Sequence, residues 1–358
     1  MNYPQRQQNL RRAMSEHKLD ALLVTHGPNI AYLCGFTGSA GVLLADRARW
    51  TFFTDGRYTE QARREVQGAR VVIGKGAALA GAGAYLAKAA PQRVGIEADR
   101  LTVAAARLLS SLLPKRARLV ETTAIVERLR MVKEAEEVER LRAAVLAGAA
   151  LLEPAVRTIA PGVRETAVAA EIEYAARRAG AQGMSFETIV AAGARSALPH
   201  GLASSQPIPR RGFVVLDFGV VLGGYCSDMT RTVHVGRPTA EMRALYEAVL
   251  SAQLAAIAAV RPGVEVAKVD AAARQTLRRA GWARFFTHST GHGVGVEIHE
   301  LPRVARGVTD VLQPGMVITI EPGVYLPGKG GVRIEDMVLV GEKGVEVLTP
   351  ASKELLTL

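Results

Sequence analysis

The sequence contains only two cysteines, Cys34 and Cys226, among 358 residues. Two cysteines cannot build the dense disulfide framework of a small secreted domain, so we expect a reducing cytoplasm. No apolar run reaches the ~18–20 residues that a membrane-spanning helix needs. The first residues, MNYPQRQQNLRRAM, also lack the apolar segment of a secretory signal. We therefore expect a cytoplasmic protein without a membrane partner.

Aromatic residues are scarce as well, at 5% of the chain, whereas hydrophobic residues make up 49% and charged residues 22%. This composition excludes a disordered, collagen-like or coiled-coil chain. The net charge of +11 raises the question of nucleic acid. The basic residues, however, are scattered over apparent helix faces, as in Arg63-Arg64 and Arg278-Arg279, with few aromatics between them. We expect a solvated basic surface and no nucleic-acid partner.

The first part of the chain alternates short apolar segments with segments of helical spacing. Strands are predicted at 21–24, 41–44, 51–54, 93–96 and 118–120, and helices at 58–66, 77–90 and 103–113. The strands 41–44 and 51–54 read as a hairpin. This order indicates an α/β domain with a mixed sheet over residues 1–125.

A segment of alternating charge begins at Lys133 and continues with helical spacing toward Glu153. We predict one long helix here and place a domain boundary near residue 125. At roughly 100–200 residues per domain, a chain of this length should hold two domains. The second domain then covers residues 126–358.

The second domain contains an internal repeat. Pro-Gly-Val occurs at 161–163 and 262–264, and Arg-Arg-Ala-Gly at 177–180 and 278–281, so both landmarks recur after 101 residues (262 − 161 and 278 − 177). Apolar strands at 212–217 and 315–321 follow, and each ends in a carboxylate. We interpret this as a duplicated helix-plus-hairpin unit whose copies face each other across a pseudo-two-fold axis.

Four carboxylates occupy matched positions in the two copies: Asp217 and Asp228 in the first, Glu321 and Glu335 in the second. Burying one ionised acid alone costs several kcal/mol, so a buried strand should not end in an unpaired carboxylate. If the copies pack face to face, the four acids converge. Converging acids must be protonated, pair with bases or bind cations.

Three of the seven histidines, His288, His292 and His299, lie within twelve residues of one another. A majority of oxygen ligands with one imidazole suits Mn²⁺, Co²⁺, Zn²⁺ or Fe²⁺ better than a metal that prefers thiolates. Four carboxylates also balance the charge of two divalent cations. Such a pair of ions can generate a nucleophilic hydroxide near neutral pH. The sequence therefore predicts a dinuclear metal site.

The set Asp217, Asp228, His292, Glu321 and Glu335 resembles the five metal ligands of the pita-bread metallopeptidases. These include methionine aminopeptidase, Xaa-Pro aminopeptidase and Xaa-Pro dipeptidase. The surrounding motifs also match: LDFG at 216–219, SDMTRT at 227–232, EPGVY at 321–325 and RIED at 333–336. In the first domain, GFTGSAG at 35–41 and FTDGRY at 53–58 resemble the creatinase-like domain of the proline-specific branch.

This resemblance covers nearly the whole chain and implies a two-domain α/β fold. A creatinase-like N-terminal α/β domain would be followed by a pseudo-two-fold pita-bread catalytic domain. It also implies a homodimer, in which the N-terminal domain packs on the active-site rim of the partner. One small departure is Ser289, where many members carry glycine; we expect little effect.

The resemblance also assigns roles residue by residue. Asp217 would chelate one metal ion, His292 and Glu321 the second, and Asp228 and Glu335 would bridge both. Glu321 would also serve as general base or proton shuttle. The remaining matched residues are catalytic histidines at His200, His288 and His299 and substrate-site residues at Arg303, Tyr325 and Arg333. Of these, Arg303 would engage the substrate carboxylate, while Tyr325 and Arg333 match residues that lie behind the ligands.

We favour a metallopeptidase that cleaves an Xaa-Pro bond with two divalent ions, Mn²⁺ before Co²⁺ or Zn²⁺. A metal-free creatinase-like hydrolase and a non-catalytic binding protein both predict lost ligands, yet all five are present. Methionine aminopeptidases normally lack the N-terminal domain. Between the proline-specific activities, the sequence leads us toward an aminopeptidase acting on peptides with proline in second position. A dipeptidase remains the alternative.

Overall fold

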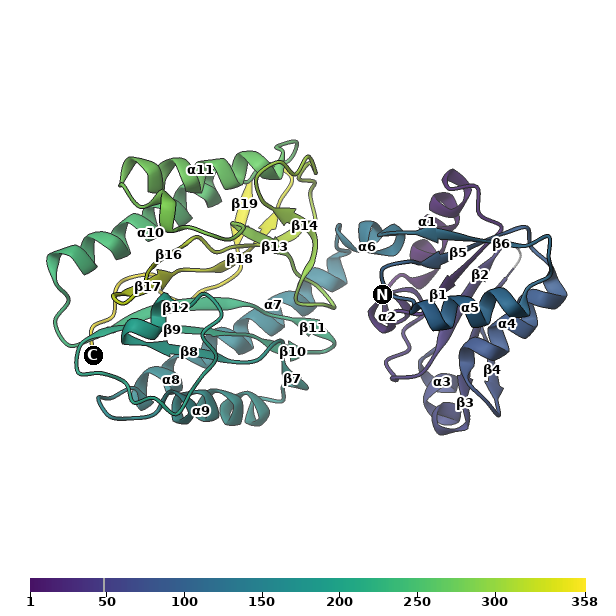
Figure 1. Cartoon of the computed structure of the whole chain (residues 1–358), viewed down its shortest axis with the longest axis horizontal. Helices are drawn as coiled ribbons and strands as arrows, with labels where there is room; N and C mark the ends of the chain where they lie inside the picture. The colour runs from purple at the N-terminus through teal and green to yellow at the C-terminus, as the bar shows by residue number, and fades with distance from the viewer. Residues whose placement is uncertain (48) are drawn as a thin grey trace. The chain divides into compact units, whose positions relative to one another are not determined.

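In the computed structural model, which describes residues 1–47 and 49–358, the chain divides into two units, Met1–Arg130 and Met131–Leu358. In the first unit, six strands form one mixed sheet in the order β4-β3-β2-β1-β5-β6 (Figure 1). The strands are β1 Ala21–Val24, β2 Val42–Asp46, β3 Trp50–Asp55, β4 Arg70–Gly74, β5 Arg93–Glu97 and β6 Arg118–Thr122. The antiparallel pairs β1–β2 and β2–β3 include the predicted hairpin, and the other pairs are parallel.

Apolar runs form the inner strands of this sheet because both of its faces are covered. Leu22 and Val24 point into one core, and Ala21 and Leu23 point into the other, as the two-residue period of a strand requires. The helices of this unit are α1 Tyr3–Glu16, α2 Gly27–Cys34, α3 Thr59–Glu65, α4 Ala78–Ala89, α5 Val103–Leu112 and α6 Ile125–Arg130, with a 3₁₀ turn η1 at Gly56–Tyr58.

The helix α6 lies at the end of the first unit. It contacts α1 and α2, and its side chains Ile125 and Val126 belong to the core beneath α1. The contacts therefore divide the chain after Arg130, whereas the sequence led us to expect a boundary near residue 125.

Two helix pairs cover the strands of the second unit from opposite sides: α8 Leu152–Thr158 with α9 Glu165–Arg178, and α10 Ala240–Ala259 with α11 Val266–Arg279 (Figure 1). The helices α9 and α11 start and end 101 residues apart (266 − 165 and 279 − 178), which is the offset of the repeat. The predicted long helix is instead two helices, α7 Ala135–Ala150 and α8. Pro154 has no N–H to donate to the carbonyl of Ala150, so the helix is interrupted there.

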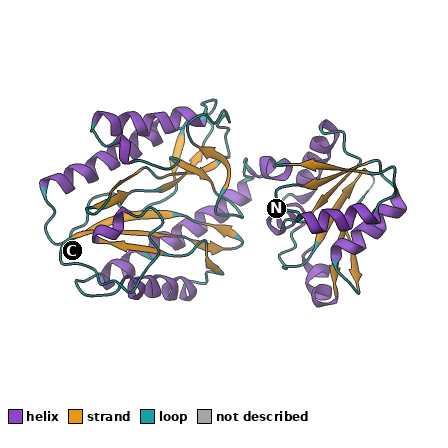
Figure 2. Cartoon of the chain, in the orientation of Figure 1, coloured by secondary structure: helices purple, strands orange, loops and turns teal. Residues whose placement is uncertain are grey.

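The strands of the second unit form several small sheets between these helices (Figure 2). Two of them carry the acid-bearing strands: β12-β9-β8 and β14-β13-β15-β18-β19. Their bounds are β8 Ile189–Ala192, β9 Gly212–Phe218, β12 Met229–Val235, β13 Gly291–Gly293, β14 Glu300–Val304, β15 Val317–Ile320, β18 Asp336–Val340 and β19 Val345–Val347. The remaining elements are β7 Gly183–Met184, β10 Val220–Leu222, β11 Tyr225–Cys226, β16 Gly323–Leu326, β17 Gly330–Arg333, η2 Gly193–Ala197 and η3 Ala283–Phe285.

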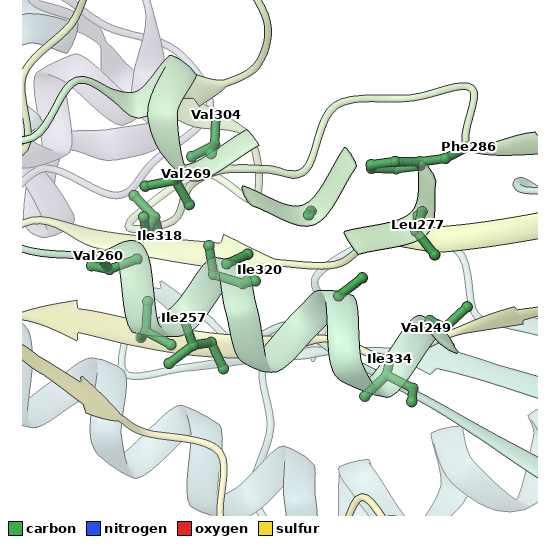
Figure 3. Packing of buried hydrophobic residues seen from close by; sticks show 14 of the residues in the cluster. Val249, Ile257, Val260, Val269, Leu277, Phe286, Val304, Ile318, Ile320 and Ile334 are labelled. Atoms are coloured by element: carbon green, nitrogen blue, oxygen red, sulfur yellow. The ribbon is translucent and has the colours of Figure 1, made fainter. Parts of the chain in front are cut away.

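The larger core of this unit lies between the second helix pair and its sheet. Val249 and Ile257 of α10 and Leu277 of α11 belong to the same buried cluster as Ile318 and Ile320 of β15 (Figure 3). Burial of apolar surface contributes about 25 cal/mol per Å², so this cluster stabilises the packing of β15 against α10 and α11. The end of β15, where Glu321 follows, is thereby held in place. Among the described helices, none is both long and apolar enough to cross a membrane.

Candidate active site

The five candidate ligands lie at or next to strand ends of the two acid-bearing sheets. Asp217 is on β9, His292 on β13, and Glu321 directly follows β15. Asp228 and Glu335 each directly precede a strand, β12 and β18 respectively. The peptide groups of Asp228 and Glu335 lie outside the hydrogen-bonded strand pairs because they contact residues of another sheet.

One backbone bond joins the two repeats at this point. The N–H of Glu335 donates to the carbonyl of Thr230 at 3.1 Å, so the start of β18 is held against the start of β12. In the antiparallel pair β9–β12, Thr230 lies opposite Asp217. The expected convergence of the two copies is thus visible in the backbone.

Glycines allow the close approach of backbone segments beside the ligands. A Cβ at Gly219 would lie 1.8 Å from the carbonyl oxygen of Ser227, and a Cβ at Gly291 would lie 1.9 Å from that of Thr319. Any larger residue would force the strands apart. Close packing beside the ligands therefore requires glycine at Gly219, two residues after Asp217, and at Gly291, directly before His292.

Three of the five candidate ligands come within reach of a common ion. One atom each from Asp228, His292 and Glu335 lies within 4.8 Å of the other two. Nε2 of His292 is 3.5 Å from Oδ2 of Asp228 and 3.7 Å from Oε1 of Glu321. Asp217 joins the group through its field, which raises the pKa of Asp228, Glu321 and Glu335.

Burial dominates the electrostatics of these acids. It raises the pKa of Asp228 well above its usual range, with further increases from Glu335 and Asp217. Burial and the neighbouring Glu335 charge raise the pKa of Glu321 in the same direction. The pKa of Glu335 rises to about 8 because of burial and then the charge of Asp217. Without a cation, the like charges favour retained protons at this site.

Two buried carboxylate oxygens are suited to binding a metal ion. Oδ1 of Asp217 and Oδ1 of Asp228 are buried and have no hydrogen-bond partner among the described residues. An unpaired buried carboxylate oxygen is costly, and a cation is the partner that would satisfy it. The donor set of four carboxylates and one imidazole is also suited to a borderline divalent ion.

The imidazole of His292 is oriented as a ligand. Its Nδ1–H donates to the carbonyl of Gly293 at 3.0 Å, which leaves Nε2 as the lone-pair atom facing Asp228 and Glu321. Burial lowers the pKa of His292 to about 4, so the ring is neutral at physiological pH. A neutral imidazole with a fixed tautomer is the form that binds metals.

A second set of contacts lies behind Asp217. Arg333 donates from Nη2 to Oδ2 of Asp217 at 2.6 Å and from Nη1 to the Tyr325 hydroxyl at 2.8 Å. That hydroxyl in turn donates to Nε2 of His288 at 2.8 Å, because Nδ1 of His288 donates to the carbonyl of Ser289. Burial and the Arg333 charge lower the pKa of His288 to about 4. Burial also raises the pKa of Tyr325 to about 12.

The other predicted site residues lie at the exposed side of the cluster. The ring of His299 is 4.5 Å from that of His292, centroid to centroid. His200 is exposed on the loop after η2, and burial together with the field of His200 lowers the pKa of His299. Arg333 donates to the carbonyl of Pro199 at 3.0 Å, which ties the His200 loop to the site. Arg303 is exposed on β14, directly opposite His292 in register.

Sequence reasoning missed two groups of residues. Thr230 donates from Oγ1 to Oε2 of Glu335 at 2.7 Å, and its place two residues after Asp228 was the available signal, because a strand has a period of two. Asp270 of α11 accepts from Thr290 at 2.8 Å and pairs with Arg274, which donates to the carbonyl of His288. An acid within the buried stripe of a helix was the signal there.

Both parts of the chain match known protein families. Residues 139–342 match the metallopeptidase family M24, and residues 6–132 match the creatinase/prolidase N-terminal domain. The "uncharacterized peptidase YqhT" of Bacillus subtilis is 38% identical over 351 residues, 98% of this chain and 99% of its own. An Xaa-Pro dipeptidase of Pyrococcus horikoshii is 35% identical over 345 residues, 96% of each chain.

Solved structures agree over the full length. An Xaa-Pro dipeptidase from Bacillus anthracis has a TM-score of 0.97 and 40% identity, covering 100% of both chains. An X-Pro aminopeptidase from Thermotoga maritima has a TM-score of 0.88 and 34% identity, covering 97% of this chain and 100% of that one. The expected creatinase-like domain and pita-bread catalytic domain are thereby confirmed. The chain is an enzyme of the metallopeptidase family M24, in its proline-specific pita-bread branch, a family that acts with divalent metal ions.

Proposed function

We propose that this enzyme is an Xaa-Pro dipeptidase, which hydrolyses the bond between the first residue and proline in a dipeptide. The sequence alone led us toward an aminopeptidase, but the relatives named above favour the dipeptidase alternative. The observation that carries the proposal is the register of β13 and β14, in which Arg303 lies opposite His292.

Directly opposed residues of an antiparallel pair point to the same face, with Cβ atoms about 5 Å apart. The Cα of Arg303 pairs with that of His292, next to a register shift between His292 and Gly293. We propose that the guanidinium of Arg303 extends from this position toward the face of the candidate ligand. Arg303 is exposed. A guanidinium binds a carboxylate through two parallel N–H donors. A dipeptide ends in such a carboxylate one residue beyond the cleaved bond, whereas a longer peptide does not.

We propose that Asp217, Asp228, His292, Glu321 and Glu335 hold two divalent ions, with Mn²⁺ favoured by the oxygen-rich donor set. Asp217 would bind one ion, His292 and Glu321 the other, and Asp228 and Glu335 both. When bound, the ions supply a Lewis acid and lower the pKa of a coordinated water. The buried, unpaired oxygens of Asp217 and Asp228 support this assignment.

The chain's own residues would bind the substrate and move the proton. Glu321 would take a proton from the attacking water and deliver it to the leaving proline nitrogen. His299 and His200, on the open side of the cluster, would donate to the developing oxyanion. Neutral His288, held by Tyr325, would line the site beside Glu321, since its Nδ1 is 3.9 Å from Oε2 of Glu321.

An aminopeptidase is the second candidate because the Thermotoga maritima structure, an X-Pro aminopeptidase, shares the fold over nearly the whole chain. The test compares Ala-Pro with Ala-Pro-Ala, with Mn²⁺, Co²⁺ and Zn²⁺ each added to metal-free enzyme. For a dipeptidase we expect kcat/KM for Ala-Pro to be about 10-fold or more above that for Ala-Pro-Ala, since the carboxylate contact is lost in the longer peptide. Faster cleavage of Ala-Pro-Ala would establish the aminopeptidase instead.

We also propose that the enzyme is a cytoplasmic homodimer. Both cysteines, Cys34 and Cys226, are free and buried, which is consistent with a reducing compartment. The dimer rests on the family resemblance. Light scattering at micromolar concentration should give twice the chain mass of 38.1 kDa, and a single chain mass would refute the dimer. Cell fractionation with a cytoplasmic marker tests the location.

A further inference from the structure

Arg231 is only 2% exposed, and each of its five N–H donors nevertheless has an acceptor. Nη1 donates to the carbonyls of Thr230 at 2.9 Å and Glu335 at 2.5 Å. Nη2 donates to Oδ1 of Asp336 at 2.6 Å. The two donors that remain reach the end of the chain: Nη2 also binds the carbonyl of Ala351 at 2.8 Å, and Nε that of Ser352 at 2.9 Å.

The residues from Ala351 to the end, here called the C-terminal tail, are fixed at several further points. Nζ of Lys353 donates to Oδ2 of Asp336 at 2.6 Å, and the carbonyl of Lys353 accepts from the Tyr246 hydroxyl at 3.0 Å. Beyond it, the N–H of Leu358 donates to the carbonyl of His234 on β12 at 2.8 Å. The tail thus runs along the strand that carries Thr230 and Arg231.

These contacts surround the peptide that carries Glu335. Arg231 holds its carbonyl, Thr230 accepts from its N–H, and the Thr230 hydroxyl donates to its carboxylate. Asp336, the next residue, is wholly buried and accepts from Arg231, Lys353 and Gln253. Without the tail, two N–H groups of Arg231 lose their acceptors in the interior. Oδ2 of Asp336 loses Lys353 and keeps only the Gln253 donor, so the contacts that hold Glu335 weaken.

We propose that the C-terminal tail positions the carboxylate of Glu335 through Arg231 and Asp336, so that Arg231 and Lys353 are positioning residues for metal retention. This inference rests on the proposed function, in which Glu335 bridges two ions. Hydrogen-bonded neighbours that orient ligands typically contribute 10–100-fold in metal affinity. A contact made by the last eight residues of the chain is thereby coupled to the metal centre.

The experiment measures Mn²⁺ per chain by elemental analysis after dialysis against graded free Mn²⁺. It compares the wild type with K353M, K353R, R231K and a chain ending at Pro350. We expect K353M to need about 10-fold more Mn²⁺ for half occupancy, and R231K and the shortened chain about 100-fold more. K353R, which keeps the ion pair with Asp336, should stay near the wild type. Activity of K353M should return when Mn²⁺ is raised, with KM for Ala-Pro unchanged.

The matched control is K329M, which removes a lysine from the exposed pair with Glu241; its Mn²⁺ affinity should equal that of the wild type. Circular dichroism of each metal-free variant checks that it is folded. If the shortened chain is unfolded, the comparison of K353M with K353R tests the proposal instead. Wild-type Mn²⁺ affinity in folded K353M would overturn the proposal. E335Q distinguishes a failure of the tail proposal from a failure of the ligand assignment. If E335Q loses Mn²⁺ while K353M does not, only the tail proposal fails. If E335Q keeps both ions, the ligand assignment fails and the tail proposal with it.

Discussion

Nη2 of Arg333 donates to Oδ2 of Asp217 at 2.6 Å, whereas Oδ1 of Asp217 is buried without a hydrogen-bond partner among the described residues. One oxygen of this carboxylate is thus oriented by a buried guanidinium, and the other is left toward the cluster. A fixed carboxylate with one unpaired oxygen is prepared for a cation, since its geometry is set before the ion arrives. The Arg333 charge also acts to lower the pKa of Asp228, Glu321 and Glu335, against the effect of their burial.

Metal removal should inactivate and destabilise the enzyme. Four acids near one another repel when ionised, and bound cations relieve that repulsion. We expect EDTA to abolish hydrolysis of Ala-Pro and to lower the Tm in calorimetry, and added Mn²⁺ or Co²⁺ to restore both. For enzyme loaded with Mn²⁺, EDTA already saturated with Mn²⁺ is the control for chelator effects on the assay. Full activity of a preparation proved metal-free by elemental analysis would contradict the proposal.

The stability of the metal-free protein should fall as pH rises. Burial and the Asp217 charge raise the pKa of Glu335 from its usual 4.5 to about 8 in the folded chain. The folded protein therefore holds this proton more tightly than the unfolded chain does. The resulting stability is fully present below about pH 4.5 and is lost as pH rises through about 8. Thermal melts of metal-free protein between pH 5 and 9 measure the slope.

The matched variant for this pH effect is E335Q, which cannot titrate at that position and should show a shallower fall in Tm. Mn²⁺-loaded wild type should also show a shallower fall, because bound cations stabilise the ionised carboxylates. Equal slopes for metal-free wild type and metal-free E335Q would show that Glu335 does not titrate in this range.

The histidines should separate into a ligand and two groups that act on the transition state. H200A and H299A should lower kcat by about 100-fold while both ions stay bound, because an oxyanion donor acts mainly in the transition state. H292A should lose metal, since Nε2 of His292 faces Asp228 and Glu321. Metal analysis beside kinetics tests the assignment. Metal loss in H200A or H299A equal to that in H292A would make it wrong.

Arg303 should determine the preference for a free C-terminal carboxylate. R303M should raise KM for Ala-Pro by about 10–100-fold, because a charge-assisted hydrogen bond contributes about 1.5–3 kcal/mol. R303K should recover only part of this, since an ammonium cannot donate two parallel bonds. The neutral substrate Ala-Pro-amide should be affected much less. The control is R306M, an exposed arginine three residues on; an equal effect of R306M would contradict a specific role for Arg303.

The sequence by itself determined the repeat and the elements built on it. The 101-residue offset predicted α9 and α11, whose bounds keep that offset, because a helix with a continuous buried stripe forms wherever that pattern occurs. Short apolar runs bounded by turns predicted the strands of the first unit for a similar local reason. The residue types in the ligand motifs were equally readable, because metal chemistry restricts which side chains can serve.

The tertiary structure alone decided which groups meet across the repeats. The helix α1 has a weak apolar pattern, since Arg6 and Gln7 are buried with Leu10 and Met14. Their acceptors include the carbonyls of Tyr32 and Leu33, which lie 26 residues away along the chain. The five-donor geometry of Arg231 likewise joins segments more than 100 residues apart. Such contacts depend on how packed elements align in space, and no local period in the sequence encodes that alignment.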